Sequence, residues 1–235
     1  GVKKEIAELK EEKLVAAASG SGFFISKAGH IVTNHHVIEG CEQVKVHQLS
    51  ETFISKVINY DSYNDLALIK INKKPEVVFS LTNQQPYLAQ DIKAAGYPLV
   101  SDLGTNVKVT KGIVSALSFR NDFSMFQMDV AVQPGNSGGP IFDDDGNILG
   151  VVVARLYNKE AQNVNFGIKA STVRSLLASN NVNLLPPNTK LINKREFSEY
   201  MTKGTVLLSC WMTLAQIEKA NKKDTNKVFF KEFQK

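Results

Sequence analysis

Ser137 lies in the hexapeptide Gly135–Pro140, in which glycines stand on both sides of a single serine. Glycine allows the backbone to bend tightly and leaves room for a substrate to approach. Adjacent backbone N–H groups in such a turn can point at one position, where a negatively charged oxygen would be stabilised. The serine hydroxyl beside that position could attack a carbonyl carbon. A glycine-rich turn between two strands is the alternative interpretation of the same string.

A serine hydroxyl is a weak nucleophile at neutral pH, so it needs a base, and that base needs a carboxylate to orient it. The stretch Thr33–Ile38 supplies two adjacent histidines, His35 and His36. Asp65 stands directly before the apolar run Leu66–Ile71, where a carboxylate could be buried beside an imidazole. The sequence therefore contains all three kinds of group that serine nucleophilic catalysis requires.

These three motifs resemble those of the HtrA/Deg branch of the trypsin-like serine peptidases, which have the chymotrypsin fold. The branch shows Thr-Asn-x-His-Val, Asp-Leu-Ala-Leu and Gly-Asn-Ser-Gly-Gly-Pro in this order, and residues 19–180 carry all three. The resemblance implies that His36 is the general base, that Asp65 orients it and that Ser137 attacks. His35 occupies the variable position of the histidine motif and is therefore not the expected base. Asp61, the competing carboxylate four residues before Asp65, is not followed by an apolar strand. The implied oxyanion hole consists of backbone N–H groups from Gly135, Asn136 and Ser137.

The resemblance also identifies residues that would contact the substrate. In trypsin-type enzymes an acid six residues before the nucleophile selects Lys or Arg, and Ala131 occupies that position here. Val132, Gly167 and Ile168 would line the same pocket, and the strand 163–169 would pair with the substrate backbone. An apolar pocket does not favour an unpaired cation, so cleavage after small or medium aliphatic residues is expected. Asp129 is expected to hold the nucleophile loop.

Composition excludes several other classes of protein. The chain has 235 residues, 43% hydrophobic and 22% charged, with a formal net charge of +5. The basic residues are scattered rather than arranged in a stripe with aromatic residues, which argues against nucleic-acid binding. No apolar run approaches the ~20 residues of a membrane helix. Cys41 and Cys210 are too few for a disulfide framework, and Cys41 has no second cysteine near it in sequence, so two separate thiols are expected.

The pattern of short apolar runs predicts the fold. Residues 3–18 are predicted as a helix with one weak apolar face, which Ser19–Gly22 would end. Two groups of about six short β-like runs follow, joined near residues 75–90, and Asp143–Asn147 is predicted as a hairpin turn rather than a metal loop. The expected fold class is all-β: two six-stranded antiparallel β-barrels of the chymotrypsin type, with short N-terminal and C-terminal helices.

Three regions are expected along the chain: an N-terminal helix or linker over 1–18, a protease domain over 19–180, and a C-terminal tail over 181–235. The domain would close with a helix over 171–180, capped by Ser171 or Thr172. The 55 residues after Asn180 are too few for a PDZ domain. Arg195–Ile217 is predicted either to pack on the core as a helix or to contact a partner, with Trp211 and Met212 in the contact, and Thr213–Ala220 is predicted to be helical.

The sequence thus predicts a serine endopeptidase that acts on polypeptides and uses no cofactor and no metal. Two alternatives remain open: a catalytically silent binding or chaperone module on the same fold, and an esterase. The α/β-hydrolase esterases place their histidine last in the chain, which argues against the second alternative. By resemblance, a bacterial periplasmic or other extracytoplasmic location, a role in protein quality control and assembly into a homo-oligomer are also expected.

Overall fold

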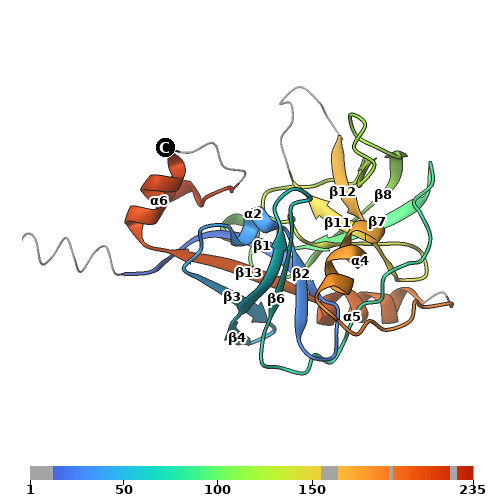
Figure 1. Ribbon diagram of the computed structural model, residues 1–235, viewed down its shortest axis with the longest axis horizontal. Helices are drawn as coiled ribbons and strands as arrows, with labels where there is room; N and C mark the ends of the chain where they lie inside the picture. The colour runs from blue at the N-terminus through green and yellow to red at the C-terminus, as the bar shows by residue number, and fades with distance from the viewer. Residues whose placement is uncertain (1–12, 155–163, 191–192, 223–226, 235) are drawn as a thin grey trace, which may run out of the picture.

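The computed structural model describes residues 13–154, 164–190, 193–222 and 227–234, so the expectations for residues 1–12 fall outside it. The described chain forms two antiparallel sheets, and the helices around them are short (Figure 1). This confirms the all-β fold class, although only one of the two sheets is a closed six-stranded barrel.

The N-terminal sheet contains seven strands where six were expected. Its spatial order is β4-β3-β13-β1-β2-β6-β5. The strands are β1 (Val15–Phe24), β2 (His30–Thr33), β3 (Gln43–Gln48), β4 (Glu51–Ile54), β5 (Lys56–Asp61), β6 (Leu66–Lys70) and β13 (Thr205–Met212). The seventh strand, β13, lies between β1 and β3 and pairs antiparallel with both.

Strand β1 corrects the expectation of a helix over 3–18, because Val15–Ala18 are extended and pair with β13. The small residues Ser19–Gly22, predicted as a helix break, lie inside this strand. Their small size serves close packing. A Cβ atom at Gly20 would lie 2.6 Å from Val37 Cγ1. Glycine at this position therefore allows β1 to pass directly beneath the short helix His35–Ile38.

The C-terminal sheet is a closed six-stranded barrel, as predicted, with the order β10-β11-β12-β9-β8-β7. Its strands are β7 (Asp91–Gly96), β8 (Lys108–Ala116), β9 (Met125–Met128), β10 (Pro140–Phe142), β11 (Ile148–Val153) and β12 (Asn165–Lys169). The turn Asp143–Asn147 joins β10 to β11, and Asp143 Oδ1 accepts a hydrogen bond from Asn147 N–H at 2.8 Å. The prediction of a hairpin turn here is confirmed.

The largest buried cluster draws on both sheets, so it joins them into one body. Phe23 and Leu68 contribute from the N-terminal sheet, and Phe142 and Phe166 contribute from the barrel. Phe79, from the connection between the sheets, packs edge-on against Phe142 with ring centroids 4.9 Å apart. Burial of this aromatic cluster holds the inner ends of the two sheets together.

The described residues also form several short helices. They are α2 (His35–Ile38), α3 (Val100–Leu103), α4 (Ala170–Ser179), α5 (Lys194–Gly204), α6 (Leu214–Asn221) and the 3₁₀ turn η1 (Lys231–Phe233). Helix α4 follows Lys169 rather than the expected cap Ser171 or Thr172. Helix α6 matches its prediction, and Thr213 and Gln216 form its capping box. Figure 1 shows α6 at the opposite end of the molecule from α4 and α5.

The segment Arg195–Ile217 does not form the single predicted helix. It forms α5, then β13, then the start of α6, and Trp211 and Met212 belong to the strand. Strand pairing on both edges explains the difference, since Leu208 lies opposite Gly20 of β1 and Val46 of β3 and the strand is buried almost throughout. Residues of the expected tail are therefore part of the N-terminal sheet.

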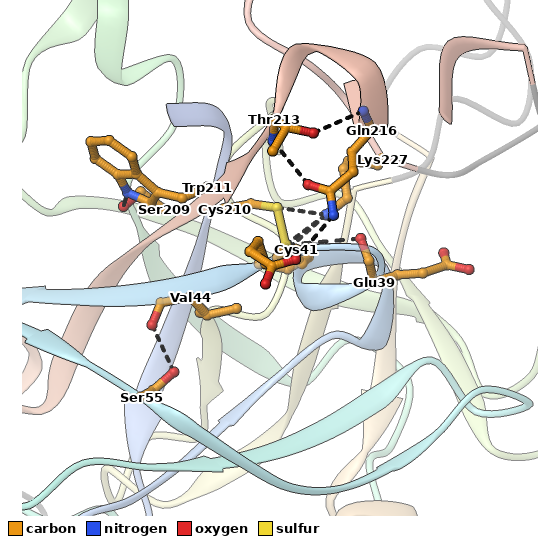
Figure 2. Close-up of a disulfide and its surroundings, with 12 residues drawn as sticks. Glu39, Cys41, Val44, Ser55, Ser209, Cys210, Trp211, Thr213, Gln216 and Lys227 are labelled. Atoms are coloured by element: carbon orange, nitrogen blue, oxygen red, sulfur yellow. Dashed lines mark hydrogen bonds between the residues drawn. A yellow bond between two sulfur atoms is a disulfide. The ribbon is translucent and has the colours of Figure 1, made fainter. Parts of the chain in front are cut away.

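Cys41 and Cys210 form a disulfide, which corrects the expectation of two separate thiols. Cys210 lies in β13, and its Cα is 5.3 Å from that of Cys41, just beyond α2. The two cysteines are 169 residues apart in sequence, so spacing along the chain gave no sign of the pairing. Figure 2 shows this bond with Lys227 beside it.

Candidate active site

His36 is held by the one-turn helix α2 at the end of β2. Asn34 precedes the helix, and its side-chain N–H donates to the backbone carbonyl of Asp65 at 2.9 Å. The backbone N–H of His35 donates to the same carbonyl at 3.2 Å. These two bonds fix the turn that carries His36 against the turn that carries Asp65, before either side chain is considered.

Asp65 makes two contacts with His36. Its Oδ2 lies 2.7 Å from His36 Nδ1, and its Oδ1 accepts the backbone N–H of His36 at 2.9 Å. The side chains of both residues are largely buried. Asp65 has a φ of 52°, a backbone conformation that is uncommon outside glycine and that aims the carboxylate at α2. A carboxylate on Nδ1 leaves Nε2 as the nitrogen that can accept a proton from a nucleophile.

Ser137 lies in the loop between β9 and β10, where the backbone requires glycine. Gly135 and Gly138 have φ values of 98° and 84°. A Cβ atom at Gly138 would lie only 2.2 Å from the carbonyl oxygen of Ser21, so no other residue fits there. Ser137 and His36 line the same small cavity. Ser137 Oγ accepts a hydrogen bond from Ala154 N–H at 3.3 Å, and no hydrogen bond joins it to His36 among the described residues.

Two backbone donors remain for an oxyanion. Within the described chain, the N–H groups of Gly135 and Ser137 have no acceptor. The third expected donor, Asn136 N–H, donates to Gln133 O at 3.0 Å. That bond closes a turn and engages Asn136 within the protein, so of the three expected donors Gly135 and Ser137 are the two left without an acceptor among the described residues. Removing one such donor typically reduces kcat by about 10²–10³-fold.

Ser21 contacts the loop that carries Ser137, and the sequence did not reveal this contact. Its hydroxyl donates to the carbonyl of Gly135 at 2.7 Å and accepts from Tyr97 N–H at 2.9 Å. Its backbone N–H also donates to Ser137 O at 2.8 Å. Ser21 therefore fixes both ends of the nucleophile loop. Its only sequence signal was its place in Ser19–Gly22, which was interpreted as a helix break.

Tyr97 lies on the other side of the same loop. A Cβ atom at Gly135 would lie 2.4 Å from the Tyr97 carbonyl oxygen, so the Tyr97 backbone leaves no room for a side chain at position 135. Burial raises the pKa of Tyr97 to about 12, and its protonated hydroxyl donates to Thr205 O at 3.2 Å. The loop is thus clamped between β1 and the end of β7.

The four residues expected to line the substrate pocket lie in different surroundings. Ala131 is exposed, and Val132 is half-buried against the core of the barrel. Gly167 faces Phe126 and Ile141, where a side chain would not fit. Of the four, Ile168 lines a described cavity, together with Asp65 and Val153. The structure therefore places Ile168 beside the catalytic pair and does not by itself unite the four as one pocket.

The other histidine and carboxylates considered for the site, His35, Asp61 and Asp129, have different partners. The ring of His35 stacks on Tyr60 with centroids 4.6 Å apart. Asp61 accepts hydrogen bonds from Asn64, at 3.0 Å from the backbone N–H and 2.6 Å from the side chain. Asp129 Oδ1 accepts from Ile113 N–H of β8 at 2.7 Å. Asp129 therefore supports the barrel rather than the nucleophile loop that it was expected to hold.

The described residues contain no group of three or more His, Cys, Asp or Glu side chains arranged to hold a metal ion. None of the described helices is long and apolar enough to cross a membrane.

The fold is that of the chymotrypsin-type serine peptidases. Residues 20–151 match the trypsin-like peptidase domain, so the chain belongs to the trypsin-like peptidase family. It is 35% identical over 210 residues to the uncharacterized protein y4bJ of Sinorhizobium fredii, covering 85% of this chain and 33% of that protein. It is 40% identical over 138 residues to a probable periplasmic serine endoprotease, DegP-like, of Pseudomonas savastanoi pv. phaseolicola, covering 56% of this chain and 28% of that protein.

Solved structures give the same family. The chain superimposes on a serine endoprotease from Yersinia pestis with a TM-score of 0.59 and 28% identity, covering 68% of this chain and 57% of that one. It superimposes on the HtrA-type protease AlgW with decapeptide with the same TM-score and identity, covering 69% and 51%. These results support the HtrA-like assignment. The chain spans about a third or less of the length of the curated relatives that it matches.

Proposed function

We propose that the protein is a serine endopeptidase in which Ser137 is the nucleophile, His36 the general base and Asp65 the residue that orients the base. The observation that carries the proposal is the double contact of Asp65 with His36, next to a serine in the same cavity. His36 Nε2 takes the proton of Ser137 as Oγ attacks the peptide carbonyl. The N–H groups of Gly135 and Ser137 stabilise the oxyanion that forms.

The second half of the reaction follows from the same groups. Protonated His36 gives its proton to the leaving amine, and the acyl chain remains on Ser137 as an ester. Water then enters, His36 removes its proton, and the ester is hydrolysed to regenerate Ser137. Substrate and one water molecule are the only other groups that the two steps consume, and His36 returns the proton to Ser137 at the end.

Specificity and location are part of the same proposal. The enzyme cleaves after small or medium aliphatic residues, because Ala131 supplies no charge and Ile168 contributes apolar surface beside Asp65. A preference for Arg or Lys at that position in a peptide library would contradict this. An extracytoplasmic location is supported by the Cys41–Cys210 disulfide, since such bonds persist in oxidising compartments, and by relatives named as periplasmic endoproteases. A role in protein quality control and homo-oligomer formation stay predictions.

Casein digestion by the wild type and by Ser137→Ala tests the proposal. Loss of the nucleophile should reduce kcat by roughly 10⁶-fold, and a fluorophosphonate should label the wild type but not the variant. Ser175→Ala, at an exposed position of α4, is the matched control and should keep both properties. A folded wild type that neither digests casein nor takes the label would contradict the proposal and favour a silent binding module.

A further inference from the structure

The segment Lys227–Phe230 lies against the catalytic groups, although it is far from them in sequence. Lys227 and Val228 line the small cavity that His36, Gly135 and Ser137 also line. The other walls of this cavity come from Ala18 and Ser19 of β1, from Val37 and from Pro134. This segment therefore forms part of the wall around the nucleophile.

The segment pairs with β1 as a short extra strand. Phe229 forms an antiparallel bridge with Ala18. The backbone N–H of Phe230 donates to Ala17 O at 2.8 Å. On its other edge, this part of β1 pairs with Trp211 and Cys210 of β13, so both edges are occupied here.

Buried contacts anchor the segment. The Phe229 side chain is 5% exposed and belongs to a cluster with Ala17, Ala18, Cys210, Met212 and Ile217. Lys227 Nζ donates to Val37 O at 2.7 Å and lies 3.4 and 3.5 Å from the sulfurs of Cys41 and Cys210. Figure 2 shows the Lys227 amine pointing at this disulfide. Lys227, at one end of the segment, is thus bonded to Val37, the residue that follows His36.

Lys231, the residue that follows the segment, connects it to the side of the barrel. Lys231 Nζ pairs with Asp102 Oδ2 of α3 at 2.8 Å, and α3 follows the barrel strand β7. The exposed ion pair adds little energy by itself. Its position nevertheless shows that residues 227–231 run from the N-terminal sheet to the barrel, across the junction beside Gly135.

The position of this cavity relative to the catalytic pair indicates which part of a substrate would enter it. Under the proposed function, the acyl part of the substrate lies along β12, beside the cavity lined by Asp65, Val153 and Ile168. The cavity with Lys227 and Val228 shares none of these residues and lies beside Gly135 and Val37 instead. It therefore faces the leaving-group part, which departs after His36 protonates its amine.

We propose that Lys227–Phe230 is a specificity-determining segment that closes the leaving-group side of the cleft and favours substrates with few residues after the scissile bond. An extended peptide binds such a cleft by adding a strand to an exposed edge. At Ala17 and Ala18 that edge is already taken. A long leaving segment must displace Phe229 and Phe230 or leave its own backbone groups unpaired, whereas one or two residues fit before the obstruction. This inference rests on the proposed function.

A peptide series with a constant acyl part and one, two, four or six residues after the scissile bond tests this proposal. For the wild type, kcat/KM should fall by roughly tenfold beyond two residues, the effect of losing one or two main-chain hydrogen bonds. Phe230→Pro should restore the long substrates and leave the short ones unchanged. Phe230 has a φ of −59°, which proline adopts, so the substitution removes the bond to Ala17 O and the aromatic ring without straining the backbone.

Gln234→Pro is the matched control for this variant. Gln234 has a φ of −78°, its N–H donates to Lys231 O, and its side-chain N–H donates to Phe229 O at 2.6 Å, so proline there removes two bonds of which neither joins the segment to β1. It should leave the length dependence unchanged. Val228→Trp provides a second test that does not depend on unpairing the strand, because a larger side chain should narrow the subsite. It should reduce cleavage before bulky residues relative to glycine. Val57→Trp, on β5 and 41% exposed against 44% for Val228, should not.

The outcomes separate this inference from the proposed function. Labelling of Ser137 by a fluorophosphonate, with kcat/KM constant or rising along the wild-type series, would overturn the segment's role and leave the peptidase intact. An equal effect of Phe230→Pro on short and long substrates would also overturn it. Absence of both labelling and cleavage in folded protein would overturn the proposed function and this inference together.

Discussion

The Ser21 hydroxyl donates a 2.7 Å hydrogen bond to the carbonyl of Gly135, a residue 114 positions later in the chain. Ser21 belongs to the N-terminal sheet and Gly135 to the loop of the barrel that carries the nucleophile. The bond therefore joins the two halves at the atoms that set the oxyanion site. Orientation of the Gly135 peptide decides how the following loop presents the N–H of Ser137.

Ser21→Ala should lower kcat by about 10–100-fold with little change in KM, because one oxyanion donor would lose its fixed position. The buried Tyr97 N–H and Gly135 O would also lose a partner, at a cost of about 1–3 kcal/mol in the free energy of unfolding. Steady-state kinetics and urea unfolding measure the two effects.

Ser26→Ala is the control, since Ser26 is also buried and its Oγ bonds to His30 Nδ1 at 2.7 Å. It should lose stability and keep kcat. An equal loss of kcat in both variants would argue that general destabilisation, and not the loop, explains the result.

Asp65→Asn should reduce kcat by about 10⁴-fold while the protein stays folded, because an amide no longer selects the tautomer of His36 that can accept a proton at Nε2. Asp61→Asn is the matched change four residues earlier, where the carboxylate bonds to Asn64 instead of a histidine. It should change kcat less than about threefold. Peptide hydrolysis assays, with the number of active molecules titrated by a fluorophosphonate, give kcat for each variant. Similar losses for both variants would contradict the assignment of Asp65.

The candidate catalytic residues could be proposed from the sequence because each lies in a local motif whose chemistry is visible in a few neighbours, and the structure brings His36 and Asp65 into contact. His36 precedes Val37, Asp65 begins an apolar run, and Ser137 stands among glycines. The barrel was predictable for a similar reason, since its hairpins join strands that are close in sequence. Ser21 was not, because small residues are typical both of a break and of a strand that must pass under α2.

The relations over long sequence distances were also hidden from the sequence. Strand β13 pairs with β1 and β3, and no local pattern states that a strand near residue 208 belongs beside residues 20 and 46. The Cys41–Cys210 bond follows from that pairing rather than from cysteine spacing. Lys227 is buried against the disulfide and α2, and no pattern in the sequence indicated this contact.

Leu208→Pro should unfold the N-terminal sheet, because Leu208 is buried in a central strand between Gly20 and Val46. Proline there removes a donor and costs about 3 kcal/mol or more. Leu214→Pro is the control: Leu214 is the first residue of α6, where proline is tolerated, and it is exposed. Circular dichroism melts should show a large decrease in Tm for the first variant only. Equal stability of the two would contradict the central placement of β13.

Lys227 gives the protein a stability that depends on pH. Burial lowers the pKa of Lys227 from its ordinary 10.5 to about 7, and the nearby charge of Glu39 only partly opposes this. Between these two values the unfolded chain binds a proton that the folded protein does not. Stability therefore rises with pH in this window, by up to about 1.4 kcal/mol per pH unit. Below pH 7 both states are protonated, and the contribution is constant.

Lys227→Met should remove this slope, so its advantage over the wild type should be largest near pH 7 and disappear toward pH 10.5. Urea unfolding of both proteins at each pH unit from 7 to 10 measures the difference, in which contributions from other groups cancel. Lys219→Met, on the exposed face of α6 and lining the cavity next to Lys227, should keep the wild-type slope. Parallel curves for the wild type and Lys227→Met would mean that the Lys227 amine is as solvated in the folded protein as in the unfolded chain.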